Sequence, residues 1–229
     1  IKKEYGTRRH TSVENAEEAV YEEKKMEETE VCFLMDRFGY MRLIDKNAYE
    51  RNKEAAHNES RYIFTCMNTD KICIFTDTGK MHTVKAADIP LVRFRDKGTP
   101  VDNLCKYDST QERMLYVAPV SQVKEDILLF VTKTSMCKMV KGDEFDVSKR
   151  TITSTKLAPE DELIFVGSAS EMEQIVLRSD GGCFLRFVLQ EISVTKKAAM
   201  GVRGMKLAEG DFLEAAYLLE GHREYTIQY

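Results

Sequence analysis

Short apolar runs separated by polar turns follow one another from Val31 onward. The runs are rich in Val, Ile, Phe and Tyr, and they are bounded by Gly, Asp, Asn and Ser. Such runs are typical of β-strands, because branched and aromatic side chains suit a pleated surface. The pattern therefore predicts an all-β domain over residues 31–229.

One unit of this pattern recurs four times. Each copy has an apolar strand, a polar turn, a second strand with a basic or histidine residue, and an apolar closing residue. The copies read VCFLMDRFGYMRLIDKNAY (31–49), KICIFTDTGKMHTVKAADI (71–89), ILLFVTKTSMCKMVKGDEF (127–145) and IVLRSDGGCFLRFVLQEI (175–192).

The four copies align on their turn residues, which are Gly39, Gly79, Ser135 and Gly182. The closing residues then fall at one offset and are Tyr49, Ile89, Phe145 and Ile192. The same register aligns the basic positions Arg42, His82 and Lys138, with Arg186 one place later.

A second element follows three of the copies and ends on leucine. The three segments read GTPVDNL (98–104), TITSTKL (151–157) and GVRGMKL (201–207), and another apolar strand comes after each of them. The recurrence distance of roughly 40–55 residues is that of a four-stranded propeller blade. One such sheet cannot bury both of its faces, so the blades are expected to pack radially on one another. The pattern predicts a propeller-like array of four repeats plus the beginning of a fifth. The alternative is a β-sandwich whose spacing is coincidental.

Residues 1–30 differ from the rest of the chain. They hold nine acids and six Lys or Arg residues, and from Ser12 to Glu30 they lack Gly and Pro. Ser12 and Asn15 are candidate helix starts. Because apolar residues are few, we interpret the segment as a solvated helix or linker; an acidic interaction arm is the alternative. The first residue is Ile1, so we expect the sequence to begin inside a longer polypeptide.

The net charge of −4 by itself argues against a nucleic-acid partner. Outside residues 1–30, however, the chain has 28 Lys or Arg residues and 29 acids, which makes this part nearly neutral. A nearly neutral domain binds DNA only by sorting its charges onto different faces. Composition therefore leaves both a DNA-binding domain and a protein-interaction domain open.

Motifs for catalysis, metal binding and membrane insertion are missing from the sequence. The six cysteines are scattered with no CxxC pair, which favours buried reduced thiols over a metal site or disulfides. The four histidines are isolated, and there is no GxSxG, Walker or GxGxxG motif. No apolar run has the length of a membrane span, and no signal-peptide pattern is present. We therefore predict neither catalytic nor metal-binding residues.

Several stretches resemble the A subunits of the gyrase and topoisomerase IV family of bacterial type II topoisomerases. IKKEYGTRRHTSV (1–13) is similar to the segment that leaves their DNA breakage-and-reunion core. FLMDRFGYMRLIDKNAYERN (33–52) resembles the first hairpin of their C-terminal domain, and EISVTKKAAMGVRGMKLAEGD (191–211) resembles its GVRG-type strand. Together with the ordered repeats, the resemblance covers essentially the whole chain.

The resemblance implies a β-pinwheel over residues 31–229, preceded by a linker or helical tail of the core over residues 1–30. A β-pinwheel is a propeller variant whose blades exchange strands and which bends DNA around its rim. In the family the strand-cleaving tyrosine lies upstream of this segment and the ATPase lies in the B subunit. We therefore expect no catalysis and no cofactor here, and a cytoplasmic, nucleoid-associated holoenzyme that uses Mg²⁺ and ATP. Its expected partners are duplex DNA and the B subunit.

One departure from the family concerns the loop after the first blade. Gyrases carry a Gln-Arg-Arg-Gly-Gly-Lys-Gly box there, which is needed for chiral wrapping and negative supercoiling. The corresponding loop here, ERNKEAAHNESRY (50–62), keeps Arg51 and Lys53 but has no glycine. This favours a topoisomerase IV-like subunit that relaxes and decatenates DNA. A gyrase subunit is one alternative, and a propeller-type protein-interaction platform is an alternative of another class.

The candidate DNA contacts are cations at matching places on successive repeats, as wrapping without base readout requires. The second hairpin strands supply Arg42, Lys46, Lys80, Lys85, Lys138, Lys141 and Arg186. The connecting segments supply Arg51, Lys53, Arg93, Arg95, Lys97, Lys149, Arg150, Lys196, Lys197, Arg203 and Lys206. His82 takes the basic position of the second repeat and is interpreted as a further rim contact. Gly201 and Gly204 fit either a tight turn or a close phosphate contact.

Overall fold

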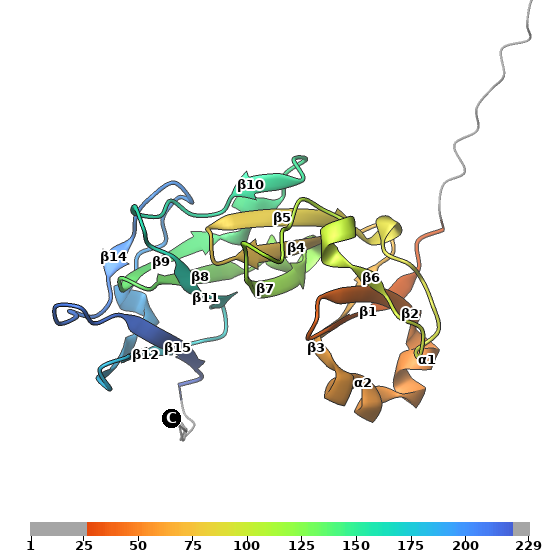
Figure 1. Ribbon diagram of the computed structural model, residues 1–229, viewed down its shortest axis with the longest axis horizontal. Helices are drawn as coiled ribbons and strands as arrows, with labels where there is room; N and C mark the ends of the chain where they lie inside the picture. Colours follow the sequence, from red (N-terminus) through yellow and green to blue (C-terminus); the bar gives the residue numbers. More distant parts are fainter. Residues whose placement is uncertain (1–26, 222–229) are drawn as a thin grey trace, which may run out of the picture.

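The computed structural model describes residues 27–221 (Figure 1). Most of the predicted linker and the predicted start of a fifth repeat lie outside the described residues. Within residues 27–221, no helix is both long enough and apolar enough to cross a membrane. The described part is built mainly from antiparallel β-sheets.

Four β-hairpins form the centres of four blades, and they coincide with the four sequence repeats. In each hairpin two consecutive strands pair antiparallel through a short turn. The hairpins are β1 (Glu30–Asp36) with β2 (Tyr40–Asp45), β4 (Lys71–Thr76) with β5 (Lys80–Lys85), β8 (Ile127–Thr132) with β9 (Met136–Lys141), and β12 (Gln174–Ser179) with β13 (Phe184–Val188).

The aligned turn residues share one backbone conformation. Gly39, Gly79, Ser135 and Gly182 have φ angles of 82°, 72°, 70° and 79°. This left-handed region favours glycine, because a Cβ atom is strained there. At Ser135 the hydroxyl accepts a hydrogen bond of 2.7 Å from the backbone N–H of Met205, which offsets part of that strain. The turn register predicted from the sequence is confirmed.

Two further strands complete each of the first three sheets, and one of them comes from the next repeat. A long strand pairs with the first strand of each hairpin; these strands are β3 (Ser60–Met67), β7 (Met114–Pro119), β11 (Leu163–Ser168) and β15 (Leu213–Leu219). A short strand that follows the next hairpin pairs with the second strand; these are β6 (Thr99–Pro100), β10 (Thr151–Thr153) and β14 (Val202–Arg203). The resulting orders are β3-β1-β2-β6, β10-β5-β4-β7, β11-β8-β9-β14 and β13-β12-β15. This exchange confirms the β-pinwheel and excludes the β-sandwich.

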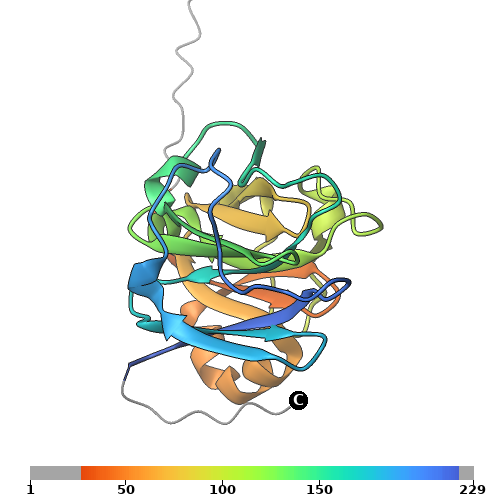
Figure 2. The same ribbon diagram turned by 90° about the vertical axis from the view of Figure 1, so that its left-hand side faces the viewer.

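The blades follow an arc with the long strands inside and the donated strands outside (Figure 1). The long strands β3, β7, β11 and β15 contact one another in sequence along the inner side of the arc. β10 and β14 lie on the outer side, and Figure 2 views the arc from the end that holds the fourth blade. The rim of the molecule is therefore built from the second hairpin strands and the strands donated to them.

Three apolar clusters fill the spaces between consecutive blades. The closing residues Ile89, Phe145 and Ile192 are buried, one in each cluster. A short 3-10 helix precedes or contains each of them; these helices are η1 (Ala86–Asp88), η3 (Gly142–Phe145) and η4 (Leu189–Glu191). The closing residue of the first repeat, Tyr49, is half-buried and packs on a smaller cluster beneath two helices, α1 (Lys46–Arg51) and α2 (Lys53–Glu59). The remaining short helices are η2 (Val101–Asn103) and α3 (Val120–Val123).

The cysteines are free thiols, and most of them are core residues. Cys32, Cys66, Cys73 and Cys137 are buried, whereas Cys183 is exposed. Burial raises the pKa of the Cys73 thiol to about 12. A buried thiol with so high a pKa is an apolar packing group rather than a nucleophile.

Candidate nucleic-acid interface

Each hairpin of the second, third and fourth repeats is followed by a loop that crosses to the rim of the preceding blade. Leu91 bridges Leu43 of β2 in parallel, and Val194 bridges Met139 of β9 in the same way. In the second blade, the N–H of Thr83 bonds to the carbonyl of Arg150 at 2.8 Å. The chain then returns as the donated strand. We call these segments, 90–98, 146–150 and 193–201, the rim loops.

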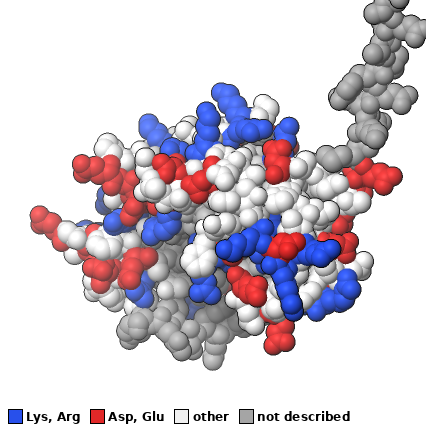
Figure 3. Space-filling model, turned by 45° about the vertical axis from the view of Figure 1, so that its right-hand side comes forward, with Lys and Arg blue, Asp and Glu red and all other residues white. Residues whose placement is uncertain are grey.

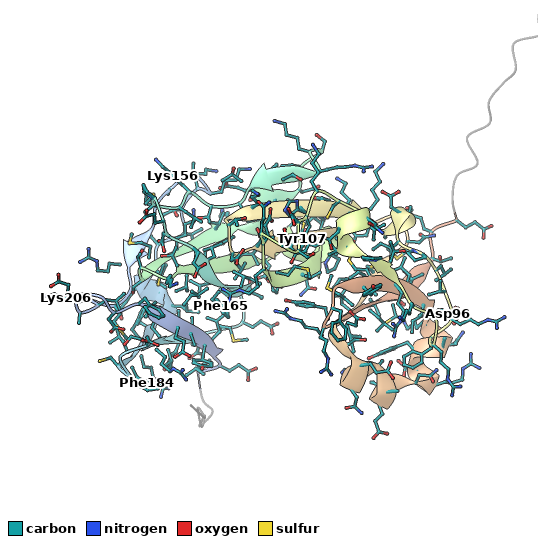
Figure 4. The ribbon with its side chains drawn as sticks, in the orientation of Figure 1. Asp96, Tyr107, Lys156, Phe165, Phe184 and Lys206 are labelled. Carbon is teal, nitrogen blue, oxygen red and sulfur yellow. The ribbon has the colours of Figure 1, made fainter. Side chains whose placement is uncertain are left out.

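The first rim loop is the most strongly basic. Arg93, Arg95 and Lys97 are exposed, and among residues 27–221 no acid forms an ion pair with them. Asp96 shapes the turn, because its carboxylate accepts a hydrogen bond of 3.1 Å from the N–H of Arg93. Figure 4 shows Asp96 at one end of the arc and Lys206, beyond the third rim loop, at the other.

A groove separates the first rim loop from α1. It has a volume of about 580 Å³ and is lined by Ala48, Arg51, Asn52, Arg93, Phe94, Arg95 and Asp96. The three arginines in its lining suit a ligand that carries negative charge on an extended surface.

The other two rim loops carry cations at corresponding places. Lys149 and Arg150 are exposed on the second, where Arg150 lies 3.7 Å from Asp88. On the third, the exposed Lys196 lies 3.5 Å from Glu144. Lys197 is half-buried and donates from Nζ to the carbonyl of Glu144 at 3.0 Å.

Further predicted contacts lie next to these loops. Lys53, Lys85, Lys141, Arg203 and Lys206 are exposed. Lys46 is exposed too, and it forms an ion pair with Glu30. Exposed ion pairs contribute little to stability, so such cations are readily given up to another anion. Figure 3 shows Lys and Arg side chains along the upper edge, at the height of β10, and in a second group lower on the right.

Three aligned basic residues are buried instead of lying on the surface. Arg42, His82 and Lys138 have 8%, 1% and 2% of their surface exposed. His82 and Lys138 make their hydrogen bonds inside the protein, and Arg42 lies 3.8 Å from Glu59, so the exposed cations are the better candidates for DNA contact. Arg186 differs from them, because it is exposed and donates to Gln174 on the neighbouring strand.

A buried carboxylate, Glu112, completes a polar cluster in the second blade. Its Oε2 lies 2.8 Å from Nε2 of His82, and its Oε1 lies 2.7 Å from Nζ of Lys80. Burial alone would raise the pKa of Glu112, but the hydrogen bonds from Lys80 and His82 outweigh it and lower that pKa. Tyr107, labelled in Figure 4, packs edge-on against His82 and donates to the carbonyl of Glu112 at 2.7 Å. The sequence pattern held no signal for this cluster, because Glu112 lies in a polar connecting segment.

The loop that lacks the gyrase box is largely helical. The Asp45 carboxylate caps α1 by accepting from the N–H groups of Asn47 and Ala48 at 2.8 and 3.3 Å. Arg51 and Lys53 are exposed on these helices, while Arg61 donates to the carbonyl of Met114 at 3.1 Å. The Asp45 cap thus occupies two of the first N–H groups of α1, and the charged donors that this segment offers on its surface are the Arg51 and Lys53 side chains.

The glycines of the GVRG segment are required by packing. A Cβ atom on Gly201 would lie 2.5 Å from the carbonyl oxygen of Cys137, and the φ of Gly201 is +88°. A Cβ atom on Gly204 would lie 2.7 Å from Sγ of Cys137. Of the two interpretations of these glycines, tight packing is thus supported.

Comparisons with known proteins agree with this architecture. The model of a family described as the DNA gyrase C-terminal domain, beta-propeller, matches residues 70–124, 126–170 and 173–220, which correspond to the second, third and fourth repeats. The DNA gyrase A protein of Deinococcus deserti is 26% identical over 223 residues, covering 92% of this chain and 28% of that protein. Its counterpart in Clostridium acetobutylicum is 27% identical over 215 residues, covering 89% of this chain and 26% of that protein. The chain thus spans about a quarter of the length of these relatives.

Solved structures with the same fold include three topoisomerase domains. The C-terminal domain of a DNA topoisomerase IV superposes with a TM-score of 0.75 at 22% identity, covering 86% of this chain and 63% of that one. The E. coli ParC C-terminal domain gives 0.66 at 13% identity, with coverages of 83% and 80%. A DNA gyrase A C-terminal domain gives 0.53 at 17% identity, with coverages of 83% and 65%. With the family model matching more than half of its length, this chain belongs to the DNA gyrase C-terminal domain family, the β-pinwheel domains of the A subunits of bacterial type II topoisomerases.

Proposed function

We propose that this domain binds duplex DNA without reading its sequence and bends the duplex along the rim. The observation that carries this proposal is the recurrence of exposed cations on three rim loops at corresponding places of successive blades. Bending a few tens of base pairs costs on the order of 1–6 kcal/mol, and phosphate contacts spread along a curved surface offset that cost. Cations at regular intervals on a rigid arc meet this requirement.

A salt titration tests the proposal. Fluorescence anisotropy with duplexes of unrelated sequence should give similar affinities, and the affinity should fall steeply as salt rises, because each phosphate contact releases counterions. Weak or salt-independent binding would instead favour the protein-interaction platform, for which the nearly neutral charge of the domain is the supporting observation.

We further propose that catalysis belongs to the rest of a holoenzyme. The parent protein would be an ATP-dependent, Mg²⁺-using type II topoisomerase, with a B subunit that binds through the remainder of the A subunit. The purified 229-residue chain should therefore bind plasmid DNA but neither nick nor relax it, with or without ATP and Mg²⁺. Gel analysis of supercoiled plasmid decides this, and nicking by the pure chain would contradict it.

We propose a topoisomerase IV-like activity for that holoenzyme, with a DNA gyrase as the alternative. The first is supported by the segment 50–62, which is mostly helical and has no glycine where gyrases carry a glycine-rich basic box. Its three cations, Arg51, Lys53 and Arg61, are matched by three glutamates. The alternative is supported by the curated relatives, which are gyrase A subunits.

Relaxed plasmid incubated with both full-length subunits and ATP distinguishes the two activities. We expect decatenation and relaxation without negative supercoiling, because a charge-balanced helical segment cannot hold the duplex as closely as a glycine-rich cationic one. A negatively supercoiled product would assign the domain to a gyrase. A catenated substrate in the same preparation is the control for active enzyme.

A further inference from the structure

The three buried basic residues occupy one register position in successive blades. Arg42 of β2 pairs with Leu34 of β1, His82 of β5 with Ile74 of β4, and Lys138 of β9 with Phe130 of β8. Each base also lies three residues before the last paired residue of its own strand. Those last paired residues are Asp45 in β2, Lys85 in β5 and Lys141 in β9. Burying a basic group is costly unless its hydrogen-bonding groups are satisfied, so a repeated buried base calls for a repeated partner.

Each of these residues has a contact in the repeat that follows, although Arg42 also lies 3.8 Å from Glu59 and His82 lies 2.8 Å from Glu112, both in their own repeats. Nζ of Lys138 donates to the carbonyl oxygens of Lys197 and Ala199 at 2.6 and 2.8 Å. Nδ1 of His82 lies 3.1 Å from the hydroxyl of Thr151 in β10. The guanidinium of Arg42 lies 5.6 Å from the centre of the Phe94 ring. A rim loop crosses the blade of each buried base. Each base thus contacts that loop or the donated strand directly after it.

The size of each base correlates with the residue that faces it from the donated strand or from directly before that strand. From the pairing of Met41 with Thr99 and of Cys137 with Val202, the residues opposite Arg42 and Lys138 are the preceding glycines, Gly98 and Gly201. A Cβ on Gly201 would lie 2.9 Å from Cβ of Lys138. The smaller His82 faces Thr151, whose hydroxyl it contacts. Long bases therefore face glycine, whereas the histidine faces a side chain that can hydrogen-bond to it.

The fourth blade has a different residue at this position. Its strand β13 pairs with β12 alone among residues 27–221, so no rim loop crosses it there. Gln174 pairs with Val188, and the residue three places earlier is Leu185, which is 37% exposed. The position that holds a buried base in the first three blades therefore holds a partly exposed leucine in the fourth.

We infer that Arg42, His82 and Lys138 are positioning residues that anchor the rim loops, and that they act on DNA through the loops rather than by touching phosphate. This inference rests on the proposed function of the rim. It assigns two layers to the interface: buried bases fix where each loop lies, and exposed cations on the loop meet the duplex. The buried bases would then determine how the exposed cations are spaced along the curved rim.

Lys138 shows why direct phosphate contact is the weaker interpretation. Two of its three donor hydrogens are directed to loop carbonyls, and its ammonium lies 5.9 Å from the centre of the Phe130 ring. Burial lowers the pKa of Lys138 to about 8, against an opposing effect of Glu144. Glu144 also holds the loop from its other side, accepting from the N–H of Lys197 at 3.1 Å. A phosphate could reach the ammonium only if the loop were displaced.

Hydrogen exchange on the 229-residue chain, without DNA, tests the anchor. In Lys138→Met the amides of Thr195 and Ala199 should exchange roughly tenfold faster or more, because the loop loses two of its attachments. Lys138→Arg, which copies the arginine–glycine pair of the first blade, should keep most of the protection. Lys124→Met, an exposed lysine outside the rim loops, is the matched control and should leave both amides unchanged.

DNA affinity provides the second readout, through a mutant cycle. Lys138→Met should weaken binding in the wild-type background but have no further effect once Lys196→Ala and Lys197→Ala are present, because the anchor acts through these two cations. A further loss in that background would mean that Lys138 contacts DNA itself, and would overturn the inference. So would unchanged exchange at Thr195 and Ala199 in a folded Lys138→Met variant. If the wild-type chain binds no DNA, the proposed function fails, while the exchange experiment still decides whether the anchor exists.

Discussion

Changing Arg93, Arg95 and Lys97 together to glutamate should lower the affinity for duplex DNA by about a hundredfold or more at low salt. The three side chains are exposed, have no acidic partner among residues 27–221, and lie at or beside the groove between the first rim loop and α1. The change removes three cations and adds three anions at one place. The salt dependence should flatten as well, and its logarithmic slope should fall by about one for each phosphate that is no longer neutralised. Anisotropy over a salt series measures both quantities.

A control with the same change in net charge separates local contact from the overall field of the protein. Arg37, Lys106 and Lys124 are exposed and lie outside the rim loops. Their combined replacement by glutamate should reduce affinity much less, because a distant charge acts only through a screened field. Equal losses of affinity in the two triple variants would show that the rim loops have no special role, and unchanged affinity in the first would place the interface elsewhere.

Glu112→Ala should destabilise the domain by about 3–5 kcal/mol at neutral pH, because it leaves a buried histidine and a lysine without their shared carboxylate. The folded state lowers the pKa of Glu112, so its stabilising contribution is full above the ordinary value of 4.5 and is lost as the pH falls through the lower, folded-state pKa. The difference in unfolding free energy between wild type and variant should therefore shrink in acid. Urea denaturation at several pH values measures it.

Glu125→Gln is the control for this second prediction. Glu125 is exposed and lies 4.0 Å from Lys124, a surface ion pair of little energetic weight. The variant should change stability by less than about 0.5 kcal/mol at any of these pH values. A Glu112→Ala domain as stable as the wild type would mean that the pairs with His82 and Lys80 contribute nothing to folding.

The repeats, turns and closing residues could be predicted from the sequence because each records a local requirement. A turn with positive φ needs a residue such as Gly79 in every copy, and a core between blades needs an apolar residue such as Phe145 at a fixed distance. These requirements repeat with the backbone, so aligning four copies reveals them. The exposed rim cations were found in the connecting segments that follow the hairpins, and their contact with DNA stays a prediction.

The burial of Arg42, His82 and Lys138 could not be predicted in the same way, because their partners are distant in sequence. Lys138 meets carbonyls 59 and 61 residues away, and His82 meets a carboxylate 30 residues away. One signal was nevertheless present. The strands YMRLID, KMHTVK and MCKMVK have apolar residues on both faces, and a strand buried on both faces buries any base within it.

The helices α1 and α2 were not predicted, although the sequence holds a signal for them. Residues 46–59 contain neither Gly nor Pro and are rich in Ala, Glu and Lys, and Asp45 is a good N-cap. The comparison with the gyrase box shows only that the segment 50–62 lacks glycine. The helical propensity of the residues that stand in their place indicates the structure that the segment adopts.

The exchange of strands has a consequence for synthesis on the ribosome. Because β6, β10 and β14 each follow the hairpin of the next repeat, a blade that has just left the exit tunnel still lacks its outermost strand. Its open side exposes the backbone groups of β2, β5 or β9 until the following repeat has been translated. Each blade is thus completed only after the next repeat has been translated. Codon changes that slow elongation between two repeats should therefore increase aggregation of nascent chains more than the same changes within a hairpin.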